Sequence, residues 1–151
     1  MQCAGKGAYG KVWIVQKKGF SGKLYAMKYI NKQRCSEMDA AQTIISERNI
    51  LTKISHPYIV NLKFAYQDDE NMYMVLDLMM GGDLRFHLNQ KVGGFSEKAL
   101  RIWTAELALA LDYLHRQKII HRYGYFYFFS WVTTIVLHST RLGQDELSFK
   151  V

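Results

Sequence analysis

The chain has 151 residues, of which 49% are apolar and 22% are charged, and its formal net charge is +7. This length suits one domain that buries roughly 68–70% of its unfolded surface, and the apolar content is ordinary for a globular protein, so disorder is not the default expectation. The positive net charge would favour binding to nucleic acid, an anionic membrane or a polyphosphate ligand, and net charge alone does not distinguish these partners. A solvated, lysine-rich surface explains it equally well.

The cysteines and the start of the chain indicate the compartment. Cys3 and Cys35 form neither a metal-ligand spacing nor a disulfide framework, and no secretory leader pattern opens the sequence. We therefore expect an intracellular, cytoplasmic protein in a reducing environment. No internal repeat or low-complexity linker divides the chain, and its composition changes abruptly only at Tyr123.

Four strands are predicted where β-branched and aromatic residues cluster, at 12–18, 24–30, 59–66 and 72–78. The first two are separated by a glycine-containing turn, as in a hairpin. The last two are separated by the acidic turn QDDEN. The fold class expected from this order is α+β, because helical patterns follow and interrupt the strands.

Three helices are predicted from apolar spacing and capping residues. In residues 37–54 the apolar side chains recur at helical spacing, at Ala40, Ile44, Leu51 and Ile54. The sequence GGDLRFHLNQ indicates a second, short helix. Ser96 is the expected N-cap of a long third helix through His115, with Glu97 favourably placed in its first turn.

Three glycines near the start have the spacing G-x-G-x-x-G. Gly5, Gly7 and Gly10 allow a tight turn that brings backbone N–H groups close to a phosphate, although glycines that only close a hairpin have the same pattern. A dinucleotide fingerprint is excluded because only four residues precede Gly5 and a β-rich run, not a helix, follows Gly10. A P-loop is excluded because Val12 replaces the Ser or Thr that holds Mg²⁺.

Two charged residues stand in apolar patterns. Lys28 projects from an otherwise apolar face of the predicted strand 24–30, and Glu47 interrupts the helical stripe between Ile44 and Leu51. Either residue alone is explained by a long side chain that reaches solvent. Together, behind a glycine-rich turn, they predict an ion pair that positions a phosphate-binding lysine. Removing one member of a buried pair typically costs about 3–5 kcal/mol.

The glycines with Val12, the sequence Ala26-Met-Lys28 and the helical Glu47 resemble the motifs of the protein kinases. The resemblance covers residues 1–122. It implies that Lys28 contacts the α and β phosphates of ATP and that Glu47 holds Lys28 in place.

The same resemblance implies the rest of an ATP site. The residues that would line the adenine pocket are Val12, Ala26, Val60 and Leu76. Leu76 occupies the gatekeeper position, and the main chain of Asp77 and Met79 would form the hydrogen bonds to the base. Asp83, in the sequence GGDL, would lie near the ribose.

The stretches YINKQRC, HPYIVNL and ALDYLHRQKIIHR are most similar to the YANK subgroup of AGC-type serine/threonine kinases, and to its fungal members in particular. The resemblance implies a small lobe and hinge over residues 1–80, with an antiparallel sheet and one helix. Residues 81–122 would begin the large lobe with two helices and end at His-Arg. A triphosphate site and a lysine-rich small lobe then explain the positive charge without nucleic acid.

The kinase pattern stops after Arg122. Tyr123 stands where the family has its catalytic Asp, and with a reference pKa near 10 a tyrosine does not replace a carboxylate as proton acceptor near neutral pH. The Asn and the DFG Asp that would hold Mg²⁺ also have no counterpart in residues 123–151. No catalytic residue and no metal ligand is therefore intact, and we expect a chain that binds ATP but does not transfer phosphate.

Residues 123–151 are expected to be an unrelated tail and not a domain. The uncharged run from Tyr123 to Leu137 has 15 residues, fewer than the roughly 20 that a membrane-spanning helix needs, so a membrane partner is not predicted. A substitute strand that covers the long helix is a second interpretation. The interpretation we favour is translated sequence from a splice or frame change with no fold of its own.

The long helix raises a question of stability. Its apolar side chains Leu100, Trp103, Leu107, Leu111 and Leu114 fall on one face. Five such side chains left in water forgo on the order of 10 kcal/mol, at about 1.5–3 kcal/mol each. This loss rivals the whole stability of a typical domain.

Two functions follow from the sequence. The first is a truncated serine/threonine kinase domain that retains the ATP-binding half of an enzyme that phosphorylates proteins with ATP and Mg²⁺. The second is a non-catalytic, pseudokinase-like decoy or interaction module. Both retain the glycines, Lys28 and Glu47.

Overall fold

The computed structural model describes residues 2–6, 10–19, 22–81, 84–90 and 94–120. The chain forms two compact units, the first made of residues 1–55 and 61–78 and the second of 56–60 and 79–151. The expected boundary at residue 80 stays a prediction. The predictions for Gly7, Asp83 and the tail from Tyr123 concern residues outside the described ranges.

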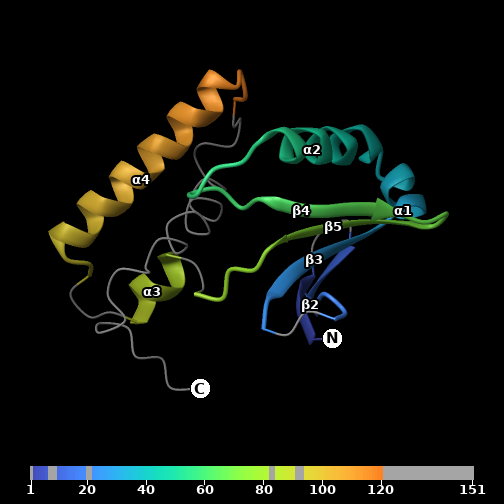
Figure 1. The fold of residues 1–151 in the computed structure, drawn as a ribbon, viewed down its shortest axis with the longest axis horizontal. Helices are drawn as coiled ribbons and strands as arrows, with labels where there is room; N and C mark the ends of the chain where they lie inside the picture. The colour runs from blue at the N-terminus through green and yellow to red at the C-terminus, as the bar shows by residue number, and fades with distance from the viewer. Residues whose placement is uncertain (1, 7–9, 20–21, 82–83, 91–93, 121–151) are drawn as a thin grey trace. The chain divides into compact units, whose positions relative to one another are not determined.

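The first unit is built on an antiparallel sheet of five strands in the order β1-β2-β3-β5-β4, which confirms the expected fold class (Figure 1). The strands are β1 (Gln2–Lys6), β2 (Gly10–Gln16), β3 (Leu24–Asn31), β4 (Leu62–Gln67) and β5 (Asn71–Asp77). All four predicted strands are present. β1 was not predicted because a five-residue run that contains Gly5 carries little strand signal, and pairing with β2 supplies its hydrogen bonds.

The helix predicted at 37–54 is shorter than expected. Its counterpart is α2 (Ala41–Lys53), and a separate short helix, α1 (Lys32–Glu37), precedes it. Asp39 interrupts the two with a positive φ of 50°, a conformation that a helix does not accommodate. α1 was not predicted because its six residues are too few to show an apolar period. Its N-cap is Asn31, whose Oδ1 accepts a hydrogen bond from the Arg34 amide at 2.9 Å.

The apolar stripe of α2 forms the core of the first unit, as predicted. Ala40, Ile44, Leu51 and Ile54 are all buried. α2 lies along one face of the sheet, on which Ile30 and Met74 are also buried (Figure 1). The 3.6-residue period therefore predicts the inward face of α2 correctly even though its first turn was placed too early.

The second unit contains α3 (Leu84–Gln90) and α4 (Glu97–Arg116), as the spacing and caps predict. Ser96 caps α4, because its Oγ accepts a hydrogen bond from the Ala99 amide at 3.3 Å. Glu97 in the first turn also pairs with Arg101 at 2.6 Å, one turn further on. Neither α4 nor another helix within the described ranges has the length and hydropathy of a membrane span.

The expectation that the apolar face of α4 is left in water is partly wrong. The buried residues of this helix are Glu106, Ala110 and Leu114, a stripe with a spacing of four. Of the five apolar residues expected on that face only Leu114 is buried, and Leu100 is 45% exposed. The loss of about 10 kcal/mol expected from five wet side chains is too high, because Trp103, Leu107 and Leu111 are half-buried.

His56 is a half-buried titratable group in the second unit. Its Nδ1 accepts a hydrogen bond from the Tyr58 amide at 3.2 Å, and its ring stacks on Tyr113 with centroids 4.9 Å apart. Burial lowers the pKa of His56 below its ordinary value of 6.5. Protonation of Nδ1 also removes the lone pair that accepts the hydrogen bond from the Tyr58 amide, so the folded state favours the neutral ring.

We predict that His56 makes stability fall as the pH drops below about 6.5, because the unfolded chain then takes up a proton that the folded chain resists. Thermal unfolding measured between pH 7.5 and 5.5 should show a smaller loss in His56→Gln than in the parent chain. His115→Gln, at an exposed histidine in the last turn of α4, is the control. Equal losses in the two variants contradict the prediction.

Candidate functional site

Lys28 and Glu47 form the ion pair that the sequence predicts. Lys28 Nζ, on β3, donates to both carboxylate oxygens of Glu47, on α2, at 2.8 and 2.9 Å. The two side chains are 28% and 40% exposed, so the expectation of a fully buried pair is wrong. The pair lies at the margin of the core, where each charge keeps part of its hydration. The ammonium therefore remains accessible to a ligand.

Three of the predicted adenine-pocket residues lie on the same face of the sheet as Lys28. Val12 is directly opposite Lys28 in the pairing of β2 with β3. Ala26 is two residues before Lys28 and directly opposite Leu76 on β5. Because side chains alternate along a strand and match across it, all four side chains point to the α2 side.

The outer glycines of the motif lie on neighbouring strands, and they differ in what surrounds them. Gly5 is in β1 and Gly10 begins β2, and the ladder between these strands pairs Lys6 with Lys11. A Cβ built on Gly10 would lie 1.7 Å from the carbonyl oxygen of Tyr29, whereas nothing lies within 4 Å of one on Gly5. Gly10 is therefore required by the close approach of β3, a reason that the sequence pattern does not reveal.

Asp77 ends β5, and its polar groups are already engaged within the first unit. Its Oδ2 accepts hydrogen bonds from the amide and the side chain of Asn61 at 3.3 and 3.2 Å, and its Oδ1 pairs with Lys63 at 3.3 Å. Its amide donates to the carbonyl of Asn61. Sequence analysis missed Asn61 and Lys63, because their contacts depend on the pairing of β4 with β5. The amide of Asp77 is therefore already used within the fold.

The other predicted site residues are not placed together with these. Val60 and Met79 belong to the second unit. Gly7 and Asp83 lie outside the described residues. The structure therefore brings together Val12, Ala26, Lys28, Glu47 and Leu76.

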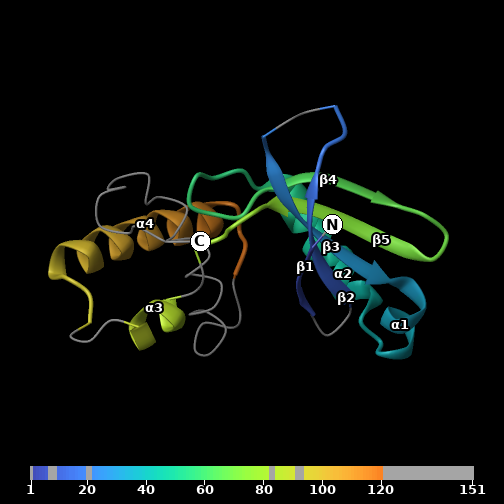
Figure 2. The same ribbon diagram turned by 90° about the horizontal axis from the view of Figure 1, so that it is seen from below.

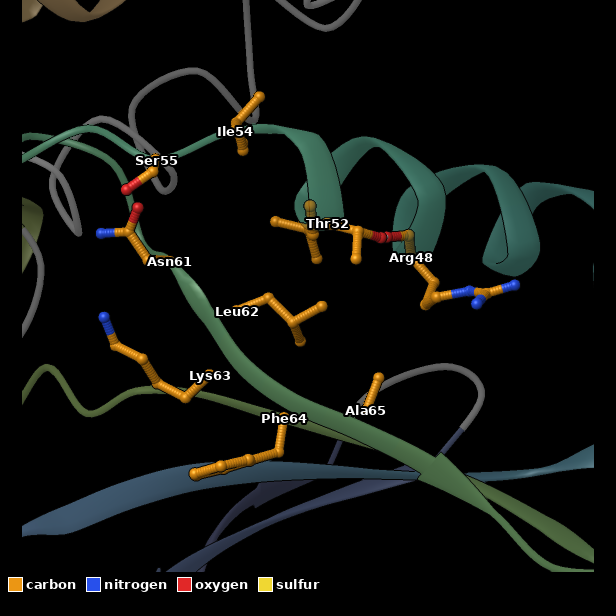
Figure 3. A pocket seen from close by; sticks show the side chains of 10 residues that line it. Arg48, Thr52, Ile54, Ser55, Asn61, Leu62, Lys63, Phe64 and Ala65 are labelled. Atoms are coloured by element: carbon orange, nitrogen blue, oxygen red, sulfur yellow. The ribbon is translucent and has the colours of Figure 1, made fainter.

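A pocket of about 420 Å³ opens in the first unit between α2 and β4 (Figure 3). Its lining residues are Arg48, Leu51, Thr52, Ile54, Ser55, Asn61, Leu62, Lys63, Phe64 and Ala65. Figure 3 shows Leu62 and Ala65 on the side of β4 that faces α2, and Phe64 on the other side. None of the predicted site residues lines this pocket, so it is separate from the Lys28 site.

Comparison with known proteins identifies the class to which this site belongs. The family model described as the protein kinase domain matches residues 1–122. The chain belongs to the protein kinase family.

Individual relatives agree with a serine/threonine kinase of AGC type. Over 122 residues, 81% of this chain, the sequence is 52% identical to mouse serine/threonine-protein kinase 32C and 50% identical to human serine/threonine-protein kinase 32B. It is 43% identical to the RAC family serine/threonine-protein kinase homolog of Dictyostelium discoideum. These alignments cover 25%, 29% and 27% of the relatives, so the chain spans about a quarter of their length.

We predict opposite effects of alanine at the two outer glycines. Gly10→Ala should lower the free energy of unfolding by about 1–3 kcal/mol, because the new methyl group displaces the β3 backbone at Tyr29. Gly5→Ala should leave stability unchanged or slightly higher, because its Cβ meets open space and alanine restricts the unfolded chain. Urea unfolding of both variants checks this, and equal destabilisation contradicts it.

We predict a modest coupling between Lys28 and Glu47, because both are partly exposed. A double-mutant cycle with Lys28→Met, Glu47→Gln and the combined variant should give about 0.2–1 kcal/mol. A fully buried pair would cost about 3–5 kcal/mol to break. Urea unfolding measures the cycle, and a value in the higher range contradicts the exposure of the two side chains. The more exposed pair of Glu97 and Arg101 is the matched control and should couple less.

Proposed function

We propose that residues 1–122 bind ATP on the α2 side of the sheet, with Lys28 as the phosphate-binding residue. The observation that carries the proposal is the geometry of Lys28. An ammonium has three N–H donors, and two of them are directed to the Glu47 carboxylate at 2.8 and 2.9 Å. The third is available to a phosphate oxygen, because the side chain is 28% exposed. Glu47 thus holds the ammonium in place and does not use all three of its N–H donors.

The adenine would contact the apolar residues beside Lys28. Val12, Ala26 and Leu76 supply an apolar surface on the same face. The resemblance to the kinases also implies a role for Val60 in contacting adenine. The carbonyl of Asp77 would accept from the base and the amide of Met79 would donate to it. We assign the accepting role to the carbonyl of Asp77 because the amide of this residue already donates to the carbonyl of Asn61. Asp83 would contact the ribose.

The glycine segment would supply backbone donors to the phosphates. Gly5 and Gly10 flank it on adjacent strands, and Gly7 would let the intervening backbone approach the ligand closely. The open space around Gly5 is consistent with a glycine that is needed for ligand binding. Gly10, in contrast, is needed for the packing of the sheet.

We also propose that this chain does not transfer phosphate. The protein kinase family uses ATP with Mg²⁺, but Tyr123 replaces the proton-accepting Asp, and residues 123–151 contain neither an asparagine nor the sequence Asp-Phe-Gly. In the described part of the chain no three His, Cys, Asp or Glu side chains form a group that could hold a metal ion. The residues do not fit a Mg²⁺ site, and we derive no step through the metal. A protein substrate is expected for the full-length members of the family.

A second candidate function, a pseudokinase-like decoy or interaction module, is favoured by the surface of α4. Leu100, Ile102 and Leu109 are 45%, 43% and 54% exposed on this helix. Exposed apolar side chains of this size are typical of protein contacts. A cytoplasmic location without nucleic acid partners suits either function.

ATP binding and phosphate transfer can be tested separately. ATP should raise the melting temperature of the chain, and Lys28→Met should weaken ATP binding about tenfold or more through loss of a charge-assisted phosphate contact. Lys53→Met, at an exposed lysine of α2, should change it by less than about twofold. Absence of ATP-dependent stabilisation in the parent chain contradicts the ATP site.

A transfer assay with radiolabelled ATP, Mg²⁺ and a basic protein substrate should detect no turnover by the parent chain. Turnover that Lys28→Met abolishes would contradict the proposed inactivity and would support ATP binding at the same time.

A further inference from the structure

The end of β5 is joined to the start of β4 by polar contacts that centre on Asp77. The Asp77 amide donates a hydrogen bond to the carbonyl of Asn61 at 3.1 Å. Its Oδ2 accepts hydrogen bonds from the amide and the side chain of Asn61 at 3.3 and 3.2 Å. Its Oδ1 pairs with the Lys63 ammonium at 3.3 Å. We call these contacts the Asp77 clamp.

The Asp77 clamp lies where the backbone leaves the sheet. β4 and β5 are neighbouring strands, as both views of the ribbon show (Figures 1 and 2). β5 ends at Asp77, and Leu78 is outside the strand. The clamp therefore holds the last residue of β5 at both its amide and its side chain, just before the support of the strand ladder ends.

An irregularity in β4 brings Lys63 to this carboxylate. The pairing with β5 shifts its register between Leu62 and Phe64, which makes Lys63 an extra residue in β4. An extra residue of this kind is a β-bulge, which redirects a side chain and is common beside active sites. Figure 3 shows the side chains of Asn61 and Lys63 directed the same way from the start of β4. The bulge thus lets both residues reach Asp77.

Holding two strands together does not by itself require a charged clamp. The Asp77 side chain is only 12% exposed, and that of Lys63 is 34% exposed. Apolar side chains of similar volume hold such a contact about as well as a largely buried ion pair does, because the ion pair must first lose water. Hydrogen bonds to a carboxylate are directional, whereas apolar contacts are not. The clamp is therefore suited to setting the orientation of a residue.

We propose that the carboxylate of Asp77 is a positioning group for adenine, which aims the carbonyl of the same residue at the exocyclic amine of the base. This inference rests on the proposed ATP site and names the side chains that set its selectivity. With the amide and the side chain of Asp77 both held, rotation about its Cα–C bond is the main freedom left to the carbonyl. A hydrogen bond weakens steeply when its donor and acceptor are misaligned. The carboxylate acts on the base through the main chain and does not touch it.

The test compares ATP with purine riboside triphosphate, which carries a hydrogen atom in place of the exocyclic amine. Isothermal titration calorimetry of the full chain gives the Kd of each nucleotide. The parent chain should prefer ATP about threefold to tenfold, as expected for one hydrogen bond. Asp77→Ala should raise the Kd of ATP by that factor and change the Kd of purine riboside triphosphate by less than about twofold.

Two further variants serve as controls. Lys28→Met removes a phosphate contact, so it should weaken both nucleotides by the same factor and leave the preference for ATP unchanged. Asp69→Ala makes the same substitution at an exposed residue of the turn between β4 and β5. It should change either Kd by less than about twofold.

The outcomes separate this inference from the ATP site on which it rests. If the parent chain does not bind ATP, the proposed ATP site is wrong. If the parent chain binds both nucleotides equally, the ATP site stands and the inference is overturned. A preference for ATP that survives in Asp77→Ala overturns it as well. Equal weakening of both nucleotides by Asp77→Ala shows a merely structural role and has the same consequence.

Circular dichroism verifies that each variant is folded, and Asp77→Asn decides the question if Asp77→Ala is not. The asparagine keeps the shape of the side chain and one acceptor oxygen. Its NH₂ group would face either the donors of Asn61 or the ammonium of Lys63, so part of the clamp is lost. The preference for ATP should fall at least about twofold, and an unchanged preference overturns the inference.

Discussion

The ion pair between Lys28 and Glu47 is the interaction on which the proposed ATP site depends. It joins the central strand β3 to α2 at 2.8 and 2.9 Å, in the middle of a helix that is otherwise held by apolar side chains. Apolar contacts are non-directional, so they hold α2 against the sheet without setting its register closely. A bidentate ion pair is directional, and it fixes both the helix and the free donor of the ammonium.

The alternation of side chains along β3 gives the sheet two faces of different chemistry. Lys28 and Ala26 face α2, where the proposed ATP site lies, and Tyr25, Met27 and Tyr29 face the other side. The apolar layer on that second face is not covered by α2. The same pleat that places a charge beside the core thus directs the aromatic side chains to the opposite face.

Periodicity predicted the elements well and their ends poorly. The stripe of α2 and the cap of α4 were correct, because both depend on local spacing and on one side chain. β1 was missed because its sequence has little strand propensity, and its hydrogen bonds come from pairing with β2. The exposure of the apolar face of α4 was overestimated, because apolar residues surround much of this helix and periodicity does not show which of them packing covers. The buried residues are Glu106, Ala110 and Leu114.

The sequence by itself determined the family, the pairing of Lys28 with Glu47 and the order of four strands and three helices, because each follows from residue types at fixed spacings. Only the tertiary structure decided how exposed that ion pair is, why Gly10 must be glycine, and which groups engage Asp77. The physical reason is the same in each case. Exposure, backbone approach and cross-strand hydrogen bonds depend on residues distant in the chain, and the register of the sheet brings them together.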